Sequence, residues 1–589
     1  MILDKVNCPD DVKQLSYDEM RTLSSEIREL IINKVNTIGG HMGPNLGIVE
    51  ATIALHYVFN SPEDKIIFDV SHQCYSHKIL TGRKEGFTNP ENYLKYTGYT
   101  APEESAHDIF KIGHTSTSVS LATGVAKARD LKGGKYNVIA LIGDGSLTGG
   151  EALEGLNNAA TLNSNIIILV NDNNISIAEN HGSIYNNLRK LRETEGKYEN
   201  NFFTALGYDY YFIKDGNNVE EVIETLQKVK DINHPVVVHM YTEKGLGLAP
   251  AVEDKEAYHW ALPGVLNQDS GSMDMGESYT SITLDYIKNK AKEDSSVIAI
   301  NAGTPGVFGY SREYRESLGN QYTDVGIAEE HAVAYSSALA NQGAKPILSF
   351  MSSFVQRTYD QLSQDLCLNN SPITMLIYWG GISGADCTHL CTFDIPLISN
   401  IPNMVYLAPT NKEEYLAMLD WSVNQTKYPV GIRVPNTELV STGVKDTTDY
   451  SDLNKFKMTE SGSKVAIIGV GNFYLKAQEV KKALEERLGI NATLINPRYV
   501  TGLDEDMLEE LKADHEVVIT LEDGAIDGGF GEKVARYYGD SDMRVLVFGA
   551  TKGFTDRVPL DELYERYHLT TDLIIEDITN TLGLLEYSN

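Results

Sequence analysis

Two polar clusters in the first third of the chain have residue types and a spacing that suit ligand chemistry. The triplet Gly-Asp-Gly at 143–145 directly follows the apolar run 138–142, and Asn-Asp-Asn-Asn at 171–174 follows the apolar run 166–170. Their separation fits one helix-containing crossover between neighbouring parallel strands. Both clusters are therefore expected at one carboxyl edge of a sheet, where open α/β folds bind ligands.

The side chains at this edge offer hard oxygen ligands. Asp144 supplies a carboxylate and Asn173 an amide oxygen, and the backbone carbonyl of Ile175 adds a third oxygen. Oxygen ligands of this kind suit Mg²⁺ that bridges a diphosphate. We therefore predict a magnesium site formed by these three residues.

Glycines and a helix start complete the predicted diphosphate site. Gly143 and Gly145 let the backbone approach phosphates, and a helix expected from about Glu151 directs its N-terminus towards them. A Gly-Asp-Gly triplet alone is often only a turn. In this strand context, and with the spaced Asn cluster, it matches the diphosphate-binding signature of thiamin diphosphate enzymes.

Composition narrows the classes of function. At 589 residues the chain is too long for one core, and its length suggests three or four domains. A net charge of −32 disfavours nucleic acid and anionic membranes as partners. No apolar stretch approaches the length of a membrane span, and the first residues do not resemble a signal peptide, so we expect a cytoplasmic protein.

The cysteines do not form a spaced framework. Cys387 and Cys391 are close enough in sequence to be two metal ligands, but no second pair accompanies them. We therefore expect reduced, partly buried thiols.

The chain divides into three α/β blocks. We predict domains at 1–262, 281–440 and 464–589, with linkers at 263–280 and 441–463. Alternating strands and helices in each block predict three doubly wound domains with mainly parallel sheets. The predicted strands are 65–70, 137–142, 166–170, 210–213, 235–240, 297–301, 346–350, 373–378, 430–434, 464–469, 493–496, 517–522 and 544–548. Gly469-Val470-Gly471-Asn472 is interpreted as a tight strand-to-helix turn, because the third glycine of a dinucleotide loop is missing.

Several further motifs occur in a characteristic order. They span residues 39–47, 69–83, 113–118, 324–333, 353–361 and 384–389. Together with the two polar clusters, they resemble the 1-deoxy-D-xylulose-5-phosphate synthase family of transketolase-like enzymes. The resemblance covers nearly the whole chain.

The resemblance implies a homodimeric transferase that uses thiamin diphosphate and Mg²⁺. It implies decarboxylation of pyruvate and transfer of the remaining two-carbon unit to an aldehyde, by default D-glyceraldehyde 3-phosphate. The product would supply isoprenoid or thiamin synthesis. Glu329 matches the carboxylate that binds the pyrimidine of the cofactor, where an interior position raises its pKa. The sequence leaves open whether each site lies within one chain or across two.

The resemblance also assigns roles to single residues. The cofactor-binding positions are His72, Gly113, His114, Thr115, Gly143, Asp144, Gly145, Ser146, Asn173, Ile175, Lys244, Glu329, Phe354 and Arg357. The positions for proton transfer and substrate contact are His41, His259, His389, Asp386 and Glu329. Taken singly, each has an ordinary structural explanation: a hydrogen-bonded histidine, a helix-start carboxylate, a core aromatic ring or a solvated lysine.

Departures from the family pattern concern the acceptor aldehyde. The family has Arg residues of a phosphate clamp where this chain has Trp379 and Asn436, and a Tyr where it has Met351. The spacing from Asp386 to His389 is one residue shorter. The segment between Asn173 and the strand at 210–213 is also short, and closure of a lid depends on this segment.

Alternative functions remain open. A different or unphosphorylated aldehyde is a close rival as acceptor, because two bidentate guanidinium groups are missing. Transketolase-type ketol transfer, a dehydrogenase component with a lipoyl partner, and a non-catalytic cofactor-binding relative are weaker. A retained Glu329 argues against the last, since a binding module does not need that carboxylate.

Overall fold

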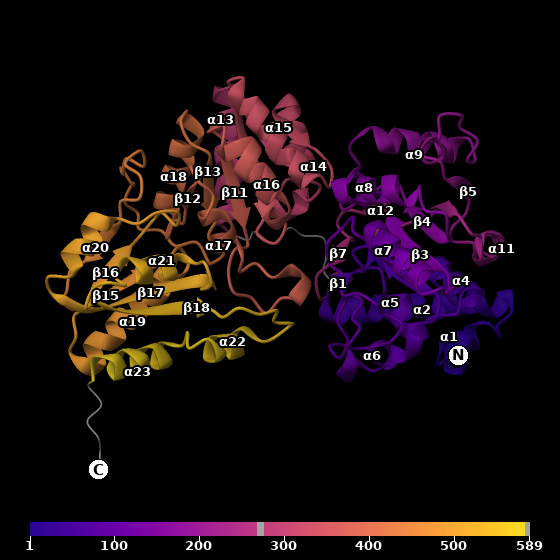
Figure 1. Ribbon diagram of the computed structural model, residues 1–589, viewed down its shortest axis with the longest axis horizontal. Coiled ribbons are helices and arrows are strands. Elements are labelled where there is room, and N and C mark those ends of the chain that lie inside the picture. Colours follow the sequence, from indigo (N-terminus) through magenta and orange to yellow (C-terminus); the bar gives the residue numbers. More distant parts are fainter. Residues whose placement is uncertain (268–275, 584–589) are drawn as a thin grey trace, which may run out of the picture. The chain divides into compact units, whose positions relative to one another are not determined.

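The structure is a computed structural model that describes residues 1–267 and 276–583. The chain divides into two compact units, and each is described by itself (Figure 1). Unit 1 comprises Met1–Met273 with Gly326–Ala328, and unit 2 comprises Asp274–Val325 with Glu329–Asn589. Residues 268–275 of the predicted linker 263–280, and residues 584–589 of the predicted third domain, lie outside the described residues.

Unit 1 is built on a five-stranded parallel sheet. Its strand order is β2 (Lys65–Phe68), β3 (Val138–Gly143), β4 (Ile166–Asp172), β6 (Pro235–Tyr241) and β5 (Asp209–Ile213). Alternate residues of β3 and β4 enter two separate hydrophobic clusters, one on each face of the sheet. Because both faces of the sheet are buried, the sequences of β3 and β4 are continuous apolar runs.

Helices cover the two faces of this sheet (Figure 1). One cluster contains residues of α2 (Tyr17–Ile38), α4 (Val49–Val58) and α11 (Val219–Val229). The other contains residues of α7 (Ser118–Leu131), α8 (Gly150–Ala159) and α9 (Ser183–Glu193). Helix α2 begins with a capping box in which the Ser16 side chain accepts from the Glu19 backbone N–H. A small antiparallel pair, β1 (Gly40–His41) with β7 (Trp260–Ala261), brings the segment after α2 beside a segment about 220 residues later in the chain.

Unit 2 contains two sheets. The six-stranded sheet is parallel, with the order β12 (Val405–Leu407), β13 (Val430–Arg433), β11 (Thr374–Tyr378), β10 (Lys345–Met351), β8 (Val297–Asn301) and β9 (Tyr322–Asp324). The five-stranded sheet has the order β14 (Lys457–Glu460), β16 (Thr493–Asn496), β15 (Lys464–Gly469), β17 (His515–Ala525) and β18 (Arg544–Ala550). Only β14 is antiparallel to its neighbour among these strands.

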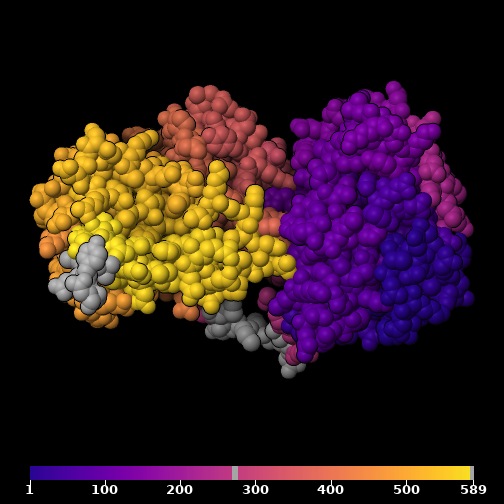
Figure 2. Space-filling view, turned by 60° about the horizontal axis from the view of Figure 1, so that its bottom comes forward, coloured from indigo at the N-terminus to yellow at the C-terminus, as the bar shows by residue number. Residues whose placement is uncertain are grey.

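The two sheets of unit 2 share one hydrophobic core. A single cluster joins Phe350 and Ile377 of the six-stranded sheet to Ile468 and Val518 of the five-stranded sheet. Helix α21 (Phe530–Tyr537) contributes to this shared cluster, whereas α19 (Phe473–Leu488) packs on the opposite face of the five-stranded sheet. In Figure 2 the orange and yellow residues accordingly form one continuous surface. The shared core explains why the two blocks behave as one compact unit.

The remaining helices of unit 2 pack on the same two sheets. The longer ones are α13 (Tyr279–Glu293), α15 (Glu329–Asn341), α18 (Lys412–Asn424) and α23 (Thr571–Leu582). The fold is therefore α/β with mainly parallel sheets, as predicted. Helix α8 begins one residue before the predicted Glu151 and follows a 3₁₀ turn, Gly145–Thr148.

Some local predictions were wrong. The stretch 441–463 was predicted as a linker, but β14 lies within it, paired with β16. The short strands β9 and β12 were not predicted, nor was the pair β1–β7. The turn at Gly469–Asn472 does lead directly from β15 into α19, and Gly471 has a positive φ of 52° there.

Two further observations concern the expectations from composition. All five cysteines lie in the described part and are free thiols. Among residues 1–267 and 276–583, none of the helices combines the length and the apolar character that crossing a membrane requires.

Asp69 fixes a loop of unit 1 that contains predicted site residues. It follows β2, is fully buried, and accepts hydrogen bonds from the backbone N–H groups of Ser116 (2.8 Å) and Ser118 (2.9 Å). The Ser116 hydroxyl in turn donates to the Ser146 carbonyl at 2.8 Å. The loop 113–118 is thereby held against the turn that follows β3.

We predict that Asp69→Asn lowers stability by about 3 kcal/mol, because an amide nitrogen replaces one acceptor facing a buried N–H group. The measurement is the melting temperature of the full-length protein by differential scanning fluorimetry. The control is Asp18→Asn, which alters a carboxylate exposed in the first turn of α2. Equal melting temperatures for Asp69→Asn and the unmodified protein would contradict the anchoring role.

Candidate functional site

Asp144 lies directly after β3, at the carboxyl edge of the unit 1 sheet. Its carboxylate is 3% exposed and accepts hydrogen bonds from Asn180 Nδ2 (2.8 Å) and the Gly145 backbone N–H (3.0 Å). Burial raises the pKa of Asp144, and the nearby carboxylate of Asp172 raises it further. A cation at this position would offset both effects.

Asn173 and Ile175 follow β4 at the same edge. Gly143 pairs with Asn171 in the register of β3 and β4, so the residues after both strands lie side by side. The Asn173 Oδ1 atom is buried and meets no hydrogen-bond donor among the described residues. Ile175 bridges to Glu179, which closes a short turn. A buried carboxylate and an unsatisfied amide oxygen form a donor set that fits Mg²⁺.

The two glycines beside Asp144 have different surroundings. A Cβ on Gly145 would lie 2.5 Å from Ser176 Oγ and 2.8 Å from Ser176 Cβ, so a side chain cannot fit without a shift. A Cβ on Gly143 would meet nothing within 4 Å. Gly145 is therefore explained by the close approach of the turn at 175–179, while open space for a ligand lies beside Gly143.

Three predicted histidines of unit 1 form one cluster. The ring of His41, on β1, lies 4.6 Å from that of His72 and 5.5 Å from that of His259, between centroids. One ring nitrogen of each lies within 4.8 Å of the others. Trp260, paired with His41 across β1 and β7, packs edge-on against it with centroids 4.7 Å apart.

Asn45 holds two of these histidine segments together, a role that was not predicted. Its Nδ2 donates to the carbonyls of His41 and His72, both at 2.8 Å, and its Oδ1 accepts from the Tyr75 backbone N–H at 2.9 Å. The side chain is fully buried. The only sequence signal was its place in the Gly-rich run 39–47.

Lys244 is a buried cation beside the histidine cluster. Its Nζ donates to the Ser176 carbonyl at 2.5 Å and lies 3.0 Å from His259 Nδ1. Burial lowers the pKa of Lys244 to about 7. Burial, followed by the charge of Lys244, lowers the pKa of His259 well below its ordinary value, so this ring is neutral at pH 7. A solvated turn lysine is therefore the wrong description of Lys244.

Gly113, His114 and Thr115 belong to the loop that Asp69 fixes. Gly113 is buried, and His114 and Thr115 are half-buried. The bond from Ser116 Oγ to the Ser146 carbonyl ties this loop to the turn after Asp144. The loop and the Gly-Asp-Gly turn are thus brought together.

Helix α9 is attached to the same edge of the sheet. Arg192 forms an ion pair with Asp172, and its second nitrogen donates to Asn174 Oδ1 at 2.7 Å. His239 Nε2 also lies 2.9 Å from Asp172 Oδ2. The carboxylate of Asp172 therefore forms an ion pair with an arginine, whereas Asp144 accepts hydrogen bonds only from uncharged donors among the described residues. The segment after Asn173 contains an ordered helix tied to the site, and its role as a lid stays a prediction.

In unit 2, Glu329 is the first residue of α15. Its carboxylate is 4% exposed, and Arg357 Nη1 lies 3.5 Å from its Oε2. Burial raises the pKa of Glu329, and the charge of Arg357 opposes this rise. This position follows β9, at the carboxyl edge of the six-stranded sheet, where a carboxyl group that shares a proton is chemically useful.

Phe354 and His389 meet at the same edge of unit 2. Their ring centroids lie 5.8 Å apart in an edge-on arrangement. The Thr388 hydroxyl joins Asp386 to His389, with Oγ1 2.9 Å from Asp386 Oδ1 and 2.8 Å from His389 Nδ1. Burial lowers the pKa of His389. The predicted pair Asp386 and His389 is therefore coupled through Thr388, which was not predicted.

The positions that depart from the family pattern lie after neighbouring strands of this sheet. Trp379 follows β11, has a positive φ of 62°, and is 49% exposed. Met351 ends β10 and is buried. Asn436 is exposed, three residues after the buried Arg433 that ends β13.

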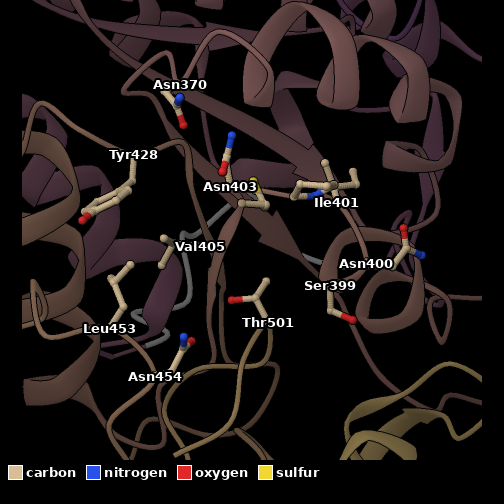
Figure 3. Close-up of a pocket in the computed structure, with 12 residues that line it drawn as sticks. Asn370, Ser399, Asn400, Ile401, Asn403, Val405, Tyr428, Leu453, Asn454 and Thr501 are labelled. Carbon is tan, nitrogen blue, oxygen red and sulfur yellow. The ribbon is translucent and has the colours of Figure 1, made fainter.

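A separate cavity of about 400 Å³ lies elsewhere in unit 2 (Figure 3). It is open near the amino end of β12, and its lining includes Asn370, Asn403, Val405 and Thr501. The predicted site residues do not line it. We therefore do not assign the predicted chemistry to this cavity.

Comparison with known proteins gives concordant matches along the chain. The profile of the 1-deoxy-D-xylulose-5-phosphate synthase family matches residues 3–200 and 194–242. The transketolase pyrimidine binding domain matches residues 277–441, and the transketolase C-terminal domain matches residues 454–574. A transketolase from Leishmania mexicana is 14% identical with a TM-score of 0.42, over 96% of this chain and 97% of that chain. A likeness at this level adds nothing to the assignment.

The sequence relatives carry the assignment. A 1-deoxy-D-xylulose-5-phosphate synthase from Caldanaerobacter subterraneus is 36% identical over 98% of this chain and 98% of its own length. One from Brevibacillus brevis is 36% identical over 99% of both chains. At this identity over nearly the whole length, the chain belongs to the 1-deoxy-D-xylulose-5-phosphate synthase family.

Proposed function

We propose that the protein catalyses the thiamin-diphosphate-dependent condensation of pyruvate with an aldehyde, with release of CO₂. The name of its relatives supports D-glyceraldehyde 3-phosphate as acceptor and 1-deoxy-D-xylulose 5-phosphate as product. The observation that carries the proposal is the buried pair of Asp144 and the unsatisfied Asn173 Oδ1 at one sheet edge.

Unit 1 supplies the diphosphate and metal ligands in this proposal. Asp144, Asn173 and the Ile175 carbonyl would hold Mg²⁺, and the cation would satisfy the Asn173 oxygen that lacks a donor. The open space beside Gly143 leaves room for phosphate oxygens. Ser146 and the fixed loop of Gly113, His114 and Thr115 adjoin this turn.

Lys244 adds a positive charge near Asp144. Its ammonium lies close enough to Asp144 to affect its pKa, and it is held between Ser176 and His259. Because it is almost fully buried, its charge acts through a medium of low dielectric constant. An anionic group bound here would restore the protonated state of Lys244 that burial disfavours.

Unit 2 supplies the groups for the pyrimidine. When bound, thiamin diphosphate supplies a nucleophilic carbon that attacks the keto carbon of pyruvate and stabilises the negative charge left by loss of CO₂. Glu329 would hold N1′ of the pyrimidine through a hydrogen bond, and its raised pKa favours sharing the proton. Phe354 would stack on the ring, with Arg357 beside Glu329.

Histidines would hold and move the protons of the substrates. His259 is neutral at pH 7 and accepts a hydrogen bond from Lys244, so it can relay a proton to or from the cluster. His41 lies between His72 and Trp260, where it can contact a small acid. His389 would orient the acceptor, with Asp386 holding it through Thr388.

The proposal includes the domain division and the assembly. Three domains, predicted at 1–262, 281–440 and 464–589 with linkers at 263–280 and 441–463, are supported by three separate family matches that end at 242 and span 277–441 and 454–574. The last match and β14 begin within the predicted linker 441–463, so the third domain would begin earlier than residue 464. Family membership supports a homodimer. Transketolase-type ketol transfer is the second candidate, and the formation of CO₂ distinguishes the two reactions.

The direct test is incubation with ¹³C-labelled pyruvate and D-glyceraldehyde 3-phosphate, with products observed by NMR. We expect labelled CO₂ from C1 and a 1-deoxyketose that retains C2 and C3. Ketol transfer from a phosphorylated ketose without consumption of pyruvate would refute the proposed reaction.

A second prediction concerns the metal site. Asn173→Ala should weaken Mg²⁺-dependent binding of thiamin diphosphate by about tenfold or more, because an oxygen ligand is lost. The measurement is isothermal titration calorimetry, with EDTA-treated protein as reference. The control is Asn157→Ala, which makes the same change at an exposed position of α8. Equal affinities for both variants would exclude Asn173 as a ligand.

A third prediction concerns Glu329. Glu329→Ala should abolish turnover while the affinity for thiamin diphosphate changes by less than about tenfold, because the carboxylate acts in catalysis more than in binding. The control Glu330→Ala, next to it in the first turn of α15, should keep kcat within about threefold. Full turnover by Glu329→Ala would show that the assigned role is wrong.

A further inference from the structure

The edge of unit 2 to which we assign the acceptor is formed by three neighbouring parallel strands. β10, β11 and β13 are adjacent in the sheet, so the residues after Met351, Tyr378 and Arg433 share one edge. The Cys391 carbonyl joins the first two strand ends: it accepts from the Gly381 backbone N–H at 2.8 Å and from Ser352 Oγ at 3.2 Å. The segment that carries His389 therefore lies between Phe354 and the turn after β11.

The guanidinium group of Arg433, at the end of β13, is already neutralised. Arg433 is 2% exposed and forms ion pairs with Asp394 and Asp523, a group called here the Arg433 triad. Its Nε lies 2.7 Å from Asp394 Oδ2, its Nη1 pairs with Asp523 Oδ1, and its Nη2 lies 3.3 Å from Asp394 Oδ1. Each of the three guanidinium nitrogens of Arg433 donates a hydrogen bond within the triad. The triad therefore contains one positive guanidinium group and two negative carboxylates.

The turn after β11 lies directly on the Arg433 triad. A Cβ on Gly380 would lie 2.7 Å from Arg433 Nε and 2.9 Å from Asp394 Oδ2. A Cβ on Gly381 would lie 2.7 Å from Asp523 Oδ2. If a methyl group cannot fit between this turn and the triad, a phosphate cannot reach the guanidinium from that side without displacing the turn.

The two side chains at this edge that stand where the family pattern has Arg, Trp379 and Asn436, are uncharged. Trp379 is half exposed and offers an indole N–H. The Asn436 backbone N–H donates to Asn472 Oδ1 at 3.1 Å, and Asn472 Nδ2 donates to Asp523 Oδ2 at 2.8 Å. Amide and indole groups suit the hydroxyls of a neutral aldehyde, whereas a phosphate dianion would face the excess negative charge of the triad.

From this arrangement we infer that the protein takes unphosphorylated hydroxyaldehydes as acceptors with an efficiency comparable to that for their phosphate esters. The inference rests on the proposed function and specifies its acceptor class. Trp379 is the position that determines specificity, because it is the accessible side chain at the end of β11, next to the glycines that cover the triad.

The test compares kcat/KM for D-glyceraldehyde and D-glyceraldehyde 3-phosphate in the holoenzyme, with pyruvate saturating and the product measured by NMR. We expect a ratio below about ten in favour of the phosphate ester, since a single charge-assisted hydrogen bond already gives more than tenfold. A preference for the ester above tenfold would overturn the inference and leave the proposed function intact. Absence of product with both aldehydes would count against the proposed function itself.

A variant pair tests the role of the edge. Trp379→Arg should raise kcat/KM for the phosphate ester relative to that for D-glyceraldehyde by about tenfold, because it adds a guanidinium group that can pair with the phosphate. The gain should shrink as ionic strength rises. The matched control Trp379→Gln removes the indole without adding charge and should leave the ratio unchanged. A ratio unmoved by Trp379→Arg, or raised equally by Trp379→Gln, would contradict the inference.

Discussion

The buried carboxyl group of Asp144 is the constraint on which the site in unit 1 depends. A carboxylate removed from water is stable only when a cation or several donors compensate for the lost hydration. Asp172, on the next strand, has Arg192 and His239 as partners, whereas Asp144 receives donors from Asn180 and its own turn. The edge of the sheet therefore holds a site with an excess of oxygen atoms. In the function that we propose, a divalent cation would resolve this imbalance.

Much of the surrounding structure positions this edge. Asp69 fixes the loop 113–118 against the turn after β3, and Asn45 ties the segments of His41 and His72 together. Gly43 and Gly47 let the backbone of that run approach Lys244, since a Cβ on either would lie 3.0–3.4 Å from residues Glu243, Lys244 and Tyr258. Such close contacts between distant segments leave little freedom, which is what a preorganised site requires.

The sequence predicted the strands best where both faces of a sheet are buried. The runs 166–170 and 465–468 are continuous apolar segments, and the structure has strands there. Strands β9, β12 and β14 escaped prediction because they are short, and the residues of β14 are exposed on an edge. The roles of Asn45 and Thr388 depend on partners that only the fold brings near. Likewise, the sequence shows Arg433, but it does not show that Asp394 and Asp523 already occupy its guanidinium.

The metal site is the claim that a single measurement tests most directly. Crystals grown with thiamin diphosphate and Mn²⁺ in place of Mg²⁺ would give an anomalous diffraction signal at the position of the cation. We predict one strong peak within bonding distance of Asp144, the Asn173 amide oxygen and the Ile175 carbonyl. A peak bound elsewhere, with Asn173 Oδ1 still without a partner while the cofactor is present, would contradict the account.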